Sequence, residues 1–157
     1  LKSEEYLYGE GKRRLDEYTM SAICMFNIIN IVDINETLGR HTGNDIITKV
    51  SQVVRQNIAA EYIFVRYMGP KFVIVFSGIE IEGNNEFMVD IKKKLESIRI
   101  EQNAQDIKAK TKAQYTSPKV NIVVSTYYKG TALEGTTKKL EEYLDAAPKD
   151  ESEINYI

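Results

Sequence analysis

The sequence is poor in the residues on which several classes of site depend. Cys24 is the only cysteine among 157 residues, and His41 is the only histidine. One cysteine inside an apolar run cannot form a disulfide framework or a cysteine-based metal site, and a reducing cytoplasm is the setting we expect. A lone histidine without clustered ligands is more typical of the surface than of catalysis. No pattern of residues predicts a serine or cysteine nucleophile triad.

Excess charge and long hydrophobic runs are also lacking. The chain has 21 Lys and Arg against 23 Asp and Glu, a net charge of −2, so no basic surplus predicts a nucleic-acid partner. No apolar stretch approaches the roughly 18 residues that a membrane span requires, and residues 1–20 contain no signal-peptide core. We therefore expect a cytoplasmic domain that makes no membrane contact.

The length and the ends of the chain indicate how it is organised. With 157 residues, of which 43% are hydrophobic and 28% charged, one globular domain is expected. Because the sequence runs from Leu1 to Ile157 without an initiating Met, we interpret it as part of a longer protein whose other domains are its partners. Residues 1–19 are charged and predict an exposed connector helix or linker, interrupted at Gly9 and Gly11. Residues 20–157 are then the folded domain.

The first half of this domain shows clear hydrophobic periodicity. Residues 22–34, rich in Ile and Val, favour a buried strand that continues into a helix, and residues 34–39 predict a short helical piece closed by Gly39. From Thr42 to Ile58, apolar residues recur at helical spacing and predict an amphipathic helix with Thr42 or Asn44 as its cap. Residues 62–67 and 72–76 predict two strands joined by a tight tip.

The second half continues the alternation of helices and strands. We expect a helix over residues 87–98, a strand over 120–128 and a helix over 133–147 that ends near Pro148, while the polar residues 107–115 are ambiguous. The order of elements predicts an α/β (α+β) fold in which helices flank a central, mostly antiparallel sheet.

Two ordered motifs resemble the GGDEF family of diguanylate cyclase-like domains. Residues 34–45, Ile-Asn-Glu-Thr-Leu-Gly-Arg-His-Thr-Gly-Asn-Asp, resemble the family's I-N-D-T-x-G-H-x-x-G-D segment, and residues 65–75 resemble its R-x-G-G-D-E-F hairpin. The signature tip falls on Met68, Gly69, Pro70, Lys71 and Phe72. The family's amino-terminal L-T-x-L-x-N-R signature cannot be found. The resemblance implies the palm-like fold of nucleotide cyclases.

The resemblance also implies a chemistry from which this sequence departs. Members of the family join two GTP molecules into cyclic di-GMP with two divalent ions, which are held by an Asp at the end of the first strand and by the second acidic residue of the tip. These positions fall on Asn27 and Lys71, although such ions need anionic ligands. Pro70 offers no backbone N–H, and Asp33 should project from the following helix. We expect a degenerate site with no metal, no cofactor and no catalytic residues.

The positions that bind guanine in the family are partly kept. They fall on Asn35, which is unchanged, and on Asn44, where the family has an Asp that accepts both N–H groups of a guanine edge. Helix capping or turn formation is the alternative role for both asparagines. The candidate nucleotide-binding residues are therefore Asn27, Asn35, Asn44 and Lys71. The family's product-inhibition motif, R-x-x-D, falls on residues 59–62, Ala-Ala-Glu-Tyr, and we expect that site to be absent.

The sequence leaves three functions open. The one we expect is a non-catalytic regulatory domain of a larger protein in cyclic di-GMP signalling, which acts through dimerisation, partner contact or nucleotide sensing. A divergent diguanylate cyclase would recruit carboxylates from elsewhere and would need Mg²⁺. A metal-free GTP receptor would use Lys71 in place of the ions, while a solvated hairpin lysine is the simpler role. Candidate partners are GTP, other domains of the same chain and a second copy of the domain.

Overall fold

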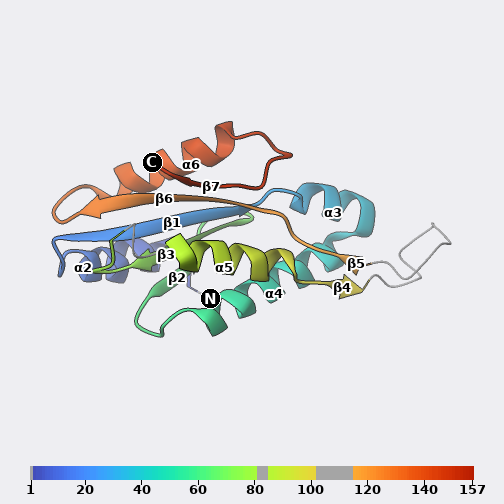
Figure 1. The fold of residues 1–157 in the computed structure, drawn as a ribbon, viewed down its shortest axis with the longest axis horizontal. Coiled ribbons are helices and arrows are strands. Elements are labelled where there is room, and N and C mark those ends of the chain that lie inside the picture. Colours follow the sequence, from blue (N-terminus) through green and yellow to red (C-terminus); the bar gives the residue numbers. More distant parts are fainter. Residues whose placement is uncertain (1, 81–84, 102–114) are drawn as a thin grey trace.

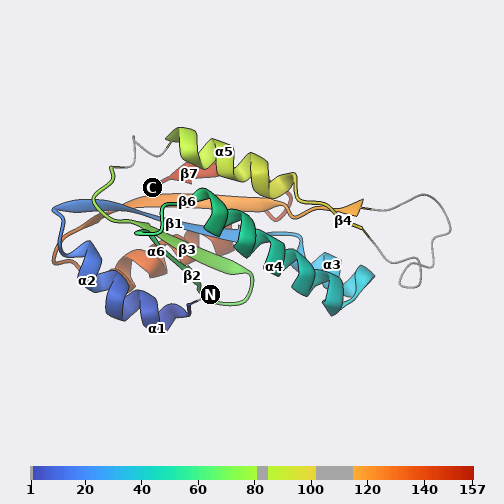
Figure 2. The same ribbon diagram turned by 90° about the horizontal axis from the view of Figure 1, so that it is seen from below.

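The computed structural model describes residues 2–80, 85–101 and 115–157, in which one mixed sheet is covered by helices on both faces (Figure 1 and Figure 2). The helical elements are α1 (Glu4–Tyr6), the π-helical η1 (Leu7–Gly11), α2 (Lys12–Leu15), α3 (Ile31–Leu38), α4 (Arg40–Asn57), α5 (Asn85–Glu96) and α6 (Leu133–Ala146). The strands are β1 (Met20–Ile28), β2 (Ile63–Arg66), β3 (Lys71–Phe76), β4 (Ile100–Glu101), β5 (Tyr115–Thr116), β6 (Val120–Tyr128) and β7 (Ile154–Tyr156).

The main sheet has the strand order β2-β3-β1-β6-β7. The first three pairings are antiparallel, and β7 lies parallel to β6. The two long strands, β1 and β6, form the centre, while β4 and β5 pair separately. The predicted α/β (α+β) fold with a mostly antiparallel sheet is confirmed. Sequence periodicity missed β7, which is only three residues long.

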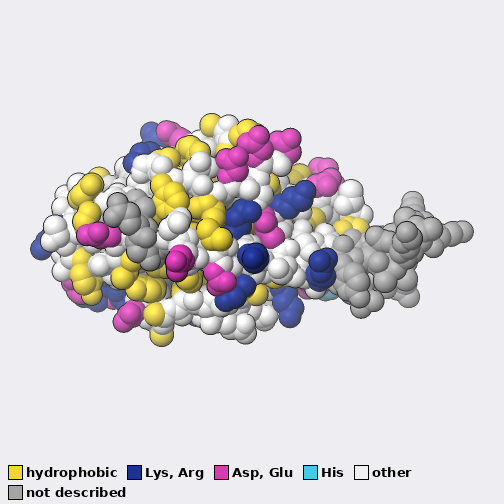
Figure 3. Space-filling model, in the orientation of Figure 1, with side chains coloured by type: hydrophobic (Ala, Val, Ile, Leu, Met, Phe, Trp, Pro, Cys, Tyr) yellow, Lys and Arg dark blue, Asp and Glu magenta, His cyan; other side chains and the backbone are white. Residues whose placement is uncertain are grey.

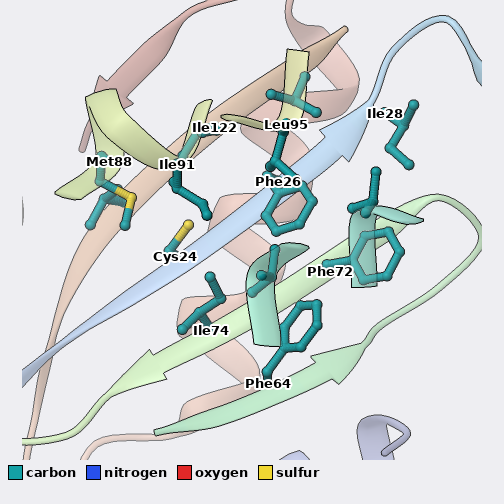
Figure 4. Close-up of a cluster of buried hydrophobic side chains, with 14 of the residues drawn as sticks. Cys24, Phe26, Ile28, Phe64, Phe72, Ile74, Met88, Ile91, Leu95 and Ile122 are labelled. Atoms are coloured by element: carbon teal, nitrogen blue, oxygen red, sulfur yellow. The ribbon is translucent and has the colours of Figure 1, made fainter. Parts of the chain in front are cut away.

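One face of the sheet is covered by α4 and α5 and is apolar along its length. Rings of Phe26, Phe64 and Phe72 stack there, with centroids 5.1 Å apart for Phe26 and Phe72 and 5.7 Å for Phe64 and Phe72. Figure 4 shows side chains of α5, including Leu95, packed against this group. Cys24 lies in the same core, where burial raises the pKa of its thiol, as expected of an inert cysteine.

The opposite face is covered by α6 and by the N-terminal helices (Figure 2). Side chains of β1 alternate between the two faces, so that Ile23 and Met25 point to this second layer. Leu140 of α6 and Leu7 and Leu15 of the N-terminal helices complete the apolar part of the layer. Both helical layers therefore depend on the period-two alternation of the central strands.

The N-terminal segment is helical, as expected, but it is not interrupted, and one side of it is buried. Helix runs without a break from Glu4 to Leu15, and Leu7 and Leu15 are fully buried. The predicted interruption at Gly9 and Gly11 is wrong because packing against β2 outweighs the low helix propensity of glycine. Gly11 is buried there, and a Cβ at this position would lie 3.2 Å from a methyl of Leu7.

The start of α4 also differs from the prediction. The helix begins at Arg40, and Gly39, with φ at 87°, separates it from α3. Thr42 is therefore inside the helix, where its hydroxyl donates a hydrogen bond to the carbonyl of Leu38 over 3.2 Å. The expected cap at Thr42 or Asn44 is wrong, because a single glycine at positive φ makes the whole turn. Of the ambiguous segment, residues 107–114 lie outside the described part of the chain.

Candidate functional site

The tip of the β2–β3 hairpin has the tight turn that its sequence predicts. Gly69 has φ at 57°, which favours glycine, and the Tyr67 N–H donates to the Lys71 carbonyl over 2.8 Å. The Ile28 N–H donates to the Pro70 carbonyl over 3.1 Å, which ties the tip to the end of β1. Met68 is exposed, whereas Phe72 is fully buried in the aromatic stack. The tip is therefore fixed in position from both sides.

Three polar residues form a row across the sheet beside this tip. Lys71 of β3 pairs in register with Asn27 of β1, which pairs in turn with Asn121 of β6. All three belong to the positions that face α6, since they alternate with residues of the other core. The structure thus brings together Asn27 and Lys71, as the sequence predicted. Asn121 was missed, although an Asn within the run VNIVVSTYY was a usable signal.

The ammonium group of Lys71 is held by carboxylates of α6. Its Nζ lies 2.9 Å from Asp145 and 3.4 Å from Glu141, and 15% of its side chain is exposed. Burial alone would lower the pKa of Lys71, but the ion pairs with Asp145 and Glu141 outweigh it and raise the pKa above its ordinary value. Lys71 is therefore cationic at neutral pH, and its charge is already compensated.

The two asparagines of the row carry side-chain oxygens that have no hydrogen-bond partner among the described residues. Asn27 is 8% exposed and Asn121 is 3% exposed, and each Oδ1 is buried. Buried acceptors are nearly always satisfied in native proteins, so such atoms point to a binding function or to bound solvent. At the end of β1 and the start of β6 the sheet therefore carries two side-chain acceptors and no carboxylate.

The second candidate group lies where α3 meets α4. Asn35 is half-buried against Gly43, because a Cβ at that glycine would overlap its Oδ1. Asn44 is exposed near the start of α4, and Asp33 is exposed on α3, as the sequence predicted. Within residues 2–80, 85–101 and 115–157, no hydrogen bond or ion pair joins Asn35 or Asn44 to the polar row. His41 is exposed and lies 3.7 Å from Asp45.

The segment at residues 59–62 borders a cavity of about 520 Å³. Two arginines of α2, Arg13 and Arg14, line it, and Arg14 donates to the Glu61 carbonyl over 2.8 Å. Sequence reasoning did not connect these arginines to the segment because Arg14 and Glu61 are 47 positions apart in the chain. Both already form ion pairs with Glu10, whose pKa their hydrogen bonds lower to about 2.

The residues that the structure describes contain no cluster of three or more His, Cys, Asp or Glu suited to a metal ion. The same residues include no helix that is both long enough and apolar enough to cross a membrane. The groups that the site offers a ligand are therefore the ion-paired ammonium of Lys71, the amides of Asn27 and Asn121, and the backbone of the hairpin tip.

Comparisons with known proteins agree with this architecture. The family model described as "Diguanylate cyclase, GGDEF domain" matches residues 3–152. Diguanylate cyclase DosC of Escherichia coli (strain K12) is 35% identical over 60 residues, which cover 38% of this chain and 13% of DosC. The chain thus matches only a small part of that relative's length.

Solved structures show the same fold at low identity. The GGDEF domain of DgcB from Caulobacter crescentus, in complex with c-di-GMP, has a TM-score of 0.84 and 15% identity over 99% of this chain and 91% of that one. The FimX GGDEF domain from Pseudomonas aeruginosa has a TM-score of 0.80 and 14% identity over 100% and 94%. Diguanylate cyclase SiaD of the same organism, in complex with its activator SiaC, has a TM-score of 0.81 and 13% identity over 99% and 58%.

Proposed function

The chain belongs to the GGDEF domain family, and on that premise we propose that it is a non-catalytic regulatory domain of a larger protein in cyclic di-GMP signalling. The observation that carries this proposal is the ion-paired Lys71. It stands at the tip position where the family has an acidic ligand, and its Nζ lies within 3.4 Å of Glu141 and Asp145. Two carboxylates of α6 therefore compensate the charge of this lysine.

Electrostatics argue against two-metal chemistry at this site. Unit charges about 4 Å apart interact by roughly 4 kcal/mol at an effective dielectric constant near 20, and a divalent ion would be repelled by about twice as much. Asn27 is a neutral amide and adds no compensating charge. A metal ion could reach the carboxylates of Glu141 and Asp145 only if Lys71 moved away, which would break ion pairs in which the lysine is largely buried.

Regulation requires that the domain be coupled to another domain or to a partner. The N-terminal helices, which lead to whatever precedes this segment, are tied to the hairpin. The Arg66 N–H donates to the Lys2 carbonyl over 2.9 Å, and the hydroxyls of Tyr8 and Tyr67 are 3.3 Å apart. A movement of these helices would therefore act directly on the residue that precedes the signature tip. Dimerisation or partner contact in the cytoplasm is the mode of action that we propose.

The test of this proposal is a turnover assay on the purified domain. Incubation with GTP and Mg²⁺ should give no cyclic di-GMP above a no-enzyme control in chromatography, while an active GGDEF domain run in parallel should give product. Product that a chelator abolishes would show a divergent cyclase and would overturn the proposal. The double variant Asn27→Asp, Lys71→Glu then asks whether restored acidic ligands are sufficient for Mg²⁺ binding.

A metal-free GTP receptor is the second candidate, and the placement of Asn35 favours it. Gly43 leaves the space that the Asn35 amide occupies between α3 and α4, so a glycine supports the orientation of the residue at the family's guanine position. In such a receptor Lys71 would contact phosphate through a charge-assisted bond worth about 1.5 to 3 kcal/mol. Lys71→Ala should then weaken GTP binding by about tenfold to a hundredfold, with little effect of Mg²⁺.

The matched control for that titration is Glu141→Gln. This change removes one of the two carboxylates on Lys71 and should strengthen GTP binding if the lysine contacts phosphate. Calorimetric titration of GTP and ATP into the three proteins, with folding checked by circular dichroism, decides the matter. Equal affinities in all three, or no binding, would reject the receptor role.

A further inference from the structure

One edge of the main sheet has no neighbouring strand among the described residues. β7 is the last strand in the order β2-β3-β1-β6-β7, and it pairs with β6 alone. The Glu153 carbonyl accepts a hydrogen bond from β6 over 2.8 Å, and the Ile157 N–H donates one to β6 over 2.9 Å. Because these directions alternate along a strand, the N–H and C=O groups of Ile154 and Tyr156 point away from β6. This edge can therefore pair with a further strand.

The face of β7 that turns toward α5 carries apolar side chains at the surface. The Tyr156 hydroxyl donates to the Asn85 side chain at the start of α5 over 2.8 Å. The Ser152 hydroxyl donates to Glu96 at the end of that helix, so α5 runs antiparallel to β7. Val89, one turn after Asn85, then lies beside β7 and is 52% exposed, while Tyr156 is 38% exposed. Figure 3 shows hydrophobic side chains at the surface near the start of α5.

The face of β7 that turns toward α6 carries charges of both signs. Glu153 and Asn155 lie close to Tyr143 of α6, since all three border one small pocket. α6 returns from the end of β6 to the start of β7, so it runs antiparallel to β7. Lys139, one turn before Tyr143, therefore lies toward Ile157. Lys139 and Glu153 are exposed, and neither forms an ion pair with another residue in the described part of the chain.

The backbone edge and the sequence of β7 fit a second copy of the same chain. An antiparallel pair of β7 strands about a two-fold axis at Asn155 places Ile154 opposite Tyr156 of the second copy. The outward N–H and C=O groups of both strands are then satisfied. Glu153 comes to lie opposite Ile157 of the second copy, so no like charges face each other. Because β7 extends only from Ile154 to Tyr156, this is the register that pairs the whole strand.

The side chains on both faces of such a pair are complementary. On the face toward α5, the Tyr156 ring of the second copy packs on Ile154 and covers Val89, which removes apolar surface from water. On the face toward α6, Lys139 lies above the end of β7 and therefore near Glu153 of the second copy. The two-fold axis repeats this ion pair on the other side. A second copy thus supplies the apolar and the charged groups that the edge requires.

We propose that the domain self-associates by antiparallel pairing of β7 with β7 of a second copy. This interface rests on the regulatory function proposed above, for which it specifies the surface of dimerisation. β6 and β1 separate β7 from the β2–β3 hairpin, so the pairing leaves the signature tip uncovered. Because the paired strands are short, the dimer is weak, with a Kd in roughly the micromolar to millimolar range.

Sedimentation equilibrium of the chain between about 10 µM and 1 mM tests the association. Tyr156→Pro removes an outward N–H that β6 does not use, and it should weaken self-association by about tenfold or more. The matched control, Tyr156→Phe, keeps this N–H and the ring and should associate like the original protein. Circular dichroism confirms that both variants fold. A chain that stays monomeric throughout, or equal association of the two variants, would overturn the proposal.

Charge reversal then identifies the interface. Lys139→Glu and Glu153→Lys each place like charges across the two-fold axis, and each should weaken self-association by about tenfold. An equimolar mixture of the two variants should associate more tightly than either alone, because both contacts of the mixed dimer are attractive. The control, Lys49→Glu, makes the same charge change at an exposed position of α4 and should have no effect.

A mixture that associates no better than its components would reject this interface, since a contact within one chain cannot be restored by mixing. The turnover assay with GTP and Mg²⁺ is independent of this result. Cyclic di-GMP production would overturn the non-catalytic function and leave the interface standing, whereas failure of the mixture would overturn the interface alone.

Discussion

The two faces of the sheet are built on different principles. The face under α4 and α5 is apolar from end to end and holds the stacked rings of Phe26, Phe64 and Phe72. The face under α6 is apolar only in part and becomes polar at Lys71, Asn27 and Asn121. The first face holds the buried Phe72 of the hairpin tip, and the second contains Asn27 and Lys71, for which the family resemblance implies metal-ligand positions. Fold and chemistry are therefore separable in this molecule.

The difference follows from the alternation of side chains along the strands. Neighbouring positions in β3, Lys71 and Phe72, point to opposite faces, so a change in one leaves the packing of the other intact. A substitution at Lys71 can thus leave unchanged the core that fixes the hairpin. We expect substitutions on the two faces to have effects of different size and kind.

The largest effect is expected on the apolar face, for Phe72→Ala. Removal of a fully buried aromatic side chain from the stack should lower the free energy of unfolding by about 3 to 5 kcal/mol. Urea unfolding followed by circular dichroism measures it, with Met68→Ala at the exposed end of the same tip as the control. If Phe72→Ala lowered the free energy of unfolding no more than Met68→Ala does, the apolar face would not be the main source of stability.

On the polar face, Lys71→Ala should cost less. The lysine is 15% exposed and Asp145 is largely solvated, so loss of the ion pairs should lower the free energy of unfolding by about 1 to 2 kcal/mol. A double-mutant cycle with Glu141→Gln isolates the pair. A coupling energy indistinguishable from zero would contradict the view that α6 holds the lysine electrostatically.

A smaller effect is expected for Tyr67→Phe, which keeps the ring and removes the hydroxyl that faces Tyr8. The Tyr8 hydroxyl also lies 2.7 Å from that of Thr137, so it retains a partner. The free energy of unfolding should fall by about 0.5 to 1.5 kcal/mol. Hydrogen exchange of the backbone amides in residues 4–15 should also become faster. Unchanged hydrogen exchange in residues 4–15 would show that the hairpin and the N-terminal helices are not coupled through this contact.

The smallest effect concerns Glu96, where α5 contacts β6. Its carboxylate accepts hydrogen bonds from the Ser152 hydroxyl, from Lys92 and from the Val120 N–H. Burial alone would raise the pKa of Glu96, but these donors outweigh it and lower the pKa below its ordinary value. The stabilisation is therefore present above the ordinary pKa and is lost as the pH falls through the lowered one.

The corresponding measurement compares the thermal midpoints of the original protein and of Glu96→Gln between pH 7 and pH 3. The original should be more stable at neutral pH, and the difference should shrink with acidification. A difference that stays constant over this range would show that the charge of Glu96 is not involved.

Much of the fold could be predicted from the sequence because its elements are long and strongly periodic. The apolar run of residues 22–34 and the helical spacing from Ile46 to Ile58 are local signals that need no tertiary information. The buried N-terminal helices could not be predicted in the same way. Leu7 and Leu15 are among the few apolar residues of a charged segment, and only contact with the sheet explains their burial.

The candidate site was predictable only in its residues and not in its contacts. The family resemblance placed Asn27 and Lys71, and strand register brings them side by side. The carboxylates of Glu141 and Asp145 are 70 and more positions away from Lys71 in the chain, so no local pattern connects them. Asn121 likewise becomes significant only because β6 pairs with β1 in that register.

The central place of β1 has a consequence for how the chain reaches its native state. Its partners are distant in sequence: Phe26 pairs with Phe72 on one side and with Ile122 on the other. During synthesis, β1 leaves the ribosome long before β3 and β6, so it has no strand to pair with at first. The β2–β3 hairpin, whose strands are close in sequence, can form before β1 has both partners. Closure of the long loop to β6 should then be the slow step. Folding should therefore depend on the C-terminal third of the domain, and a chain that stops before Val120 should not acquire the native core.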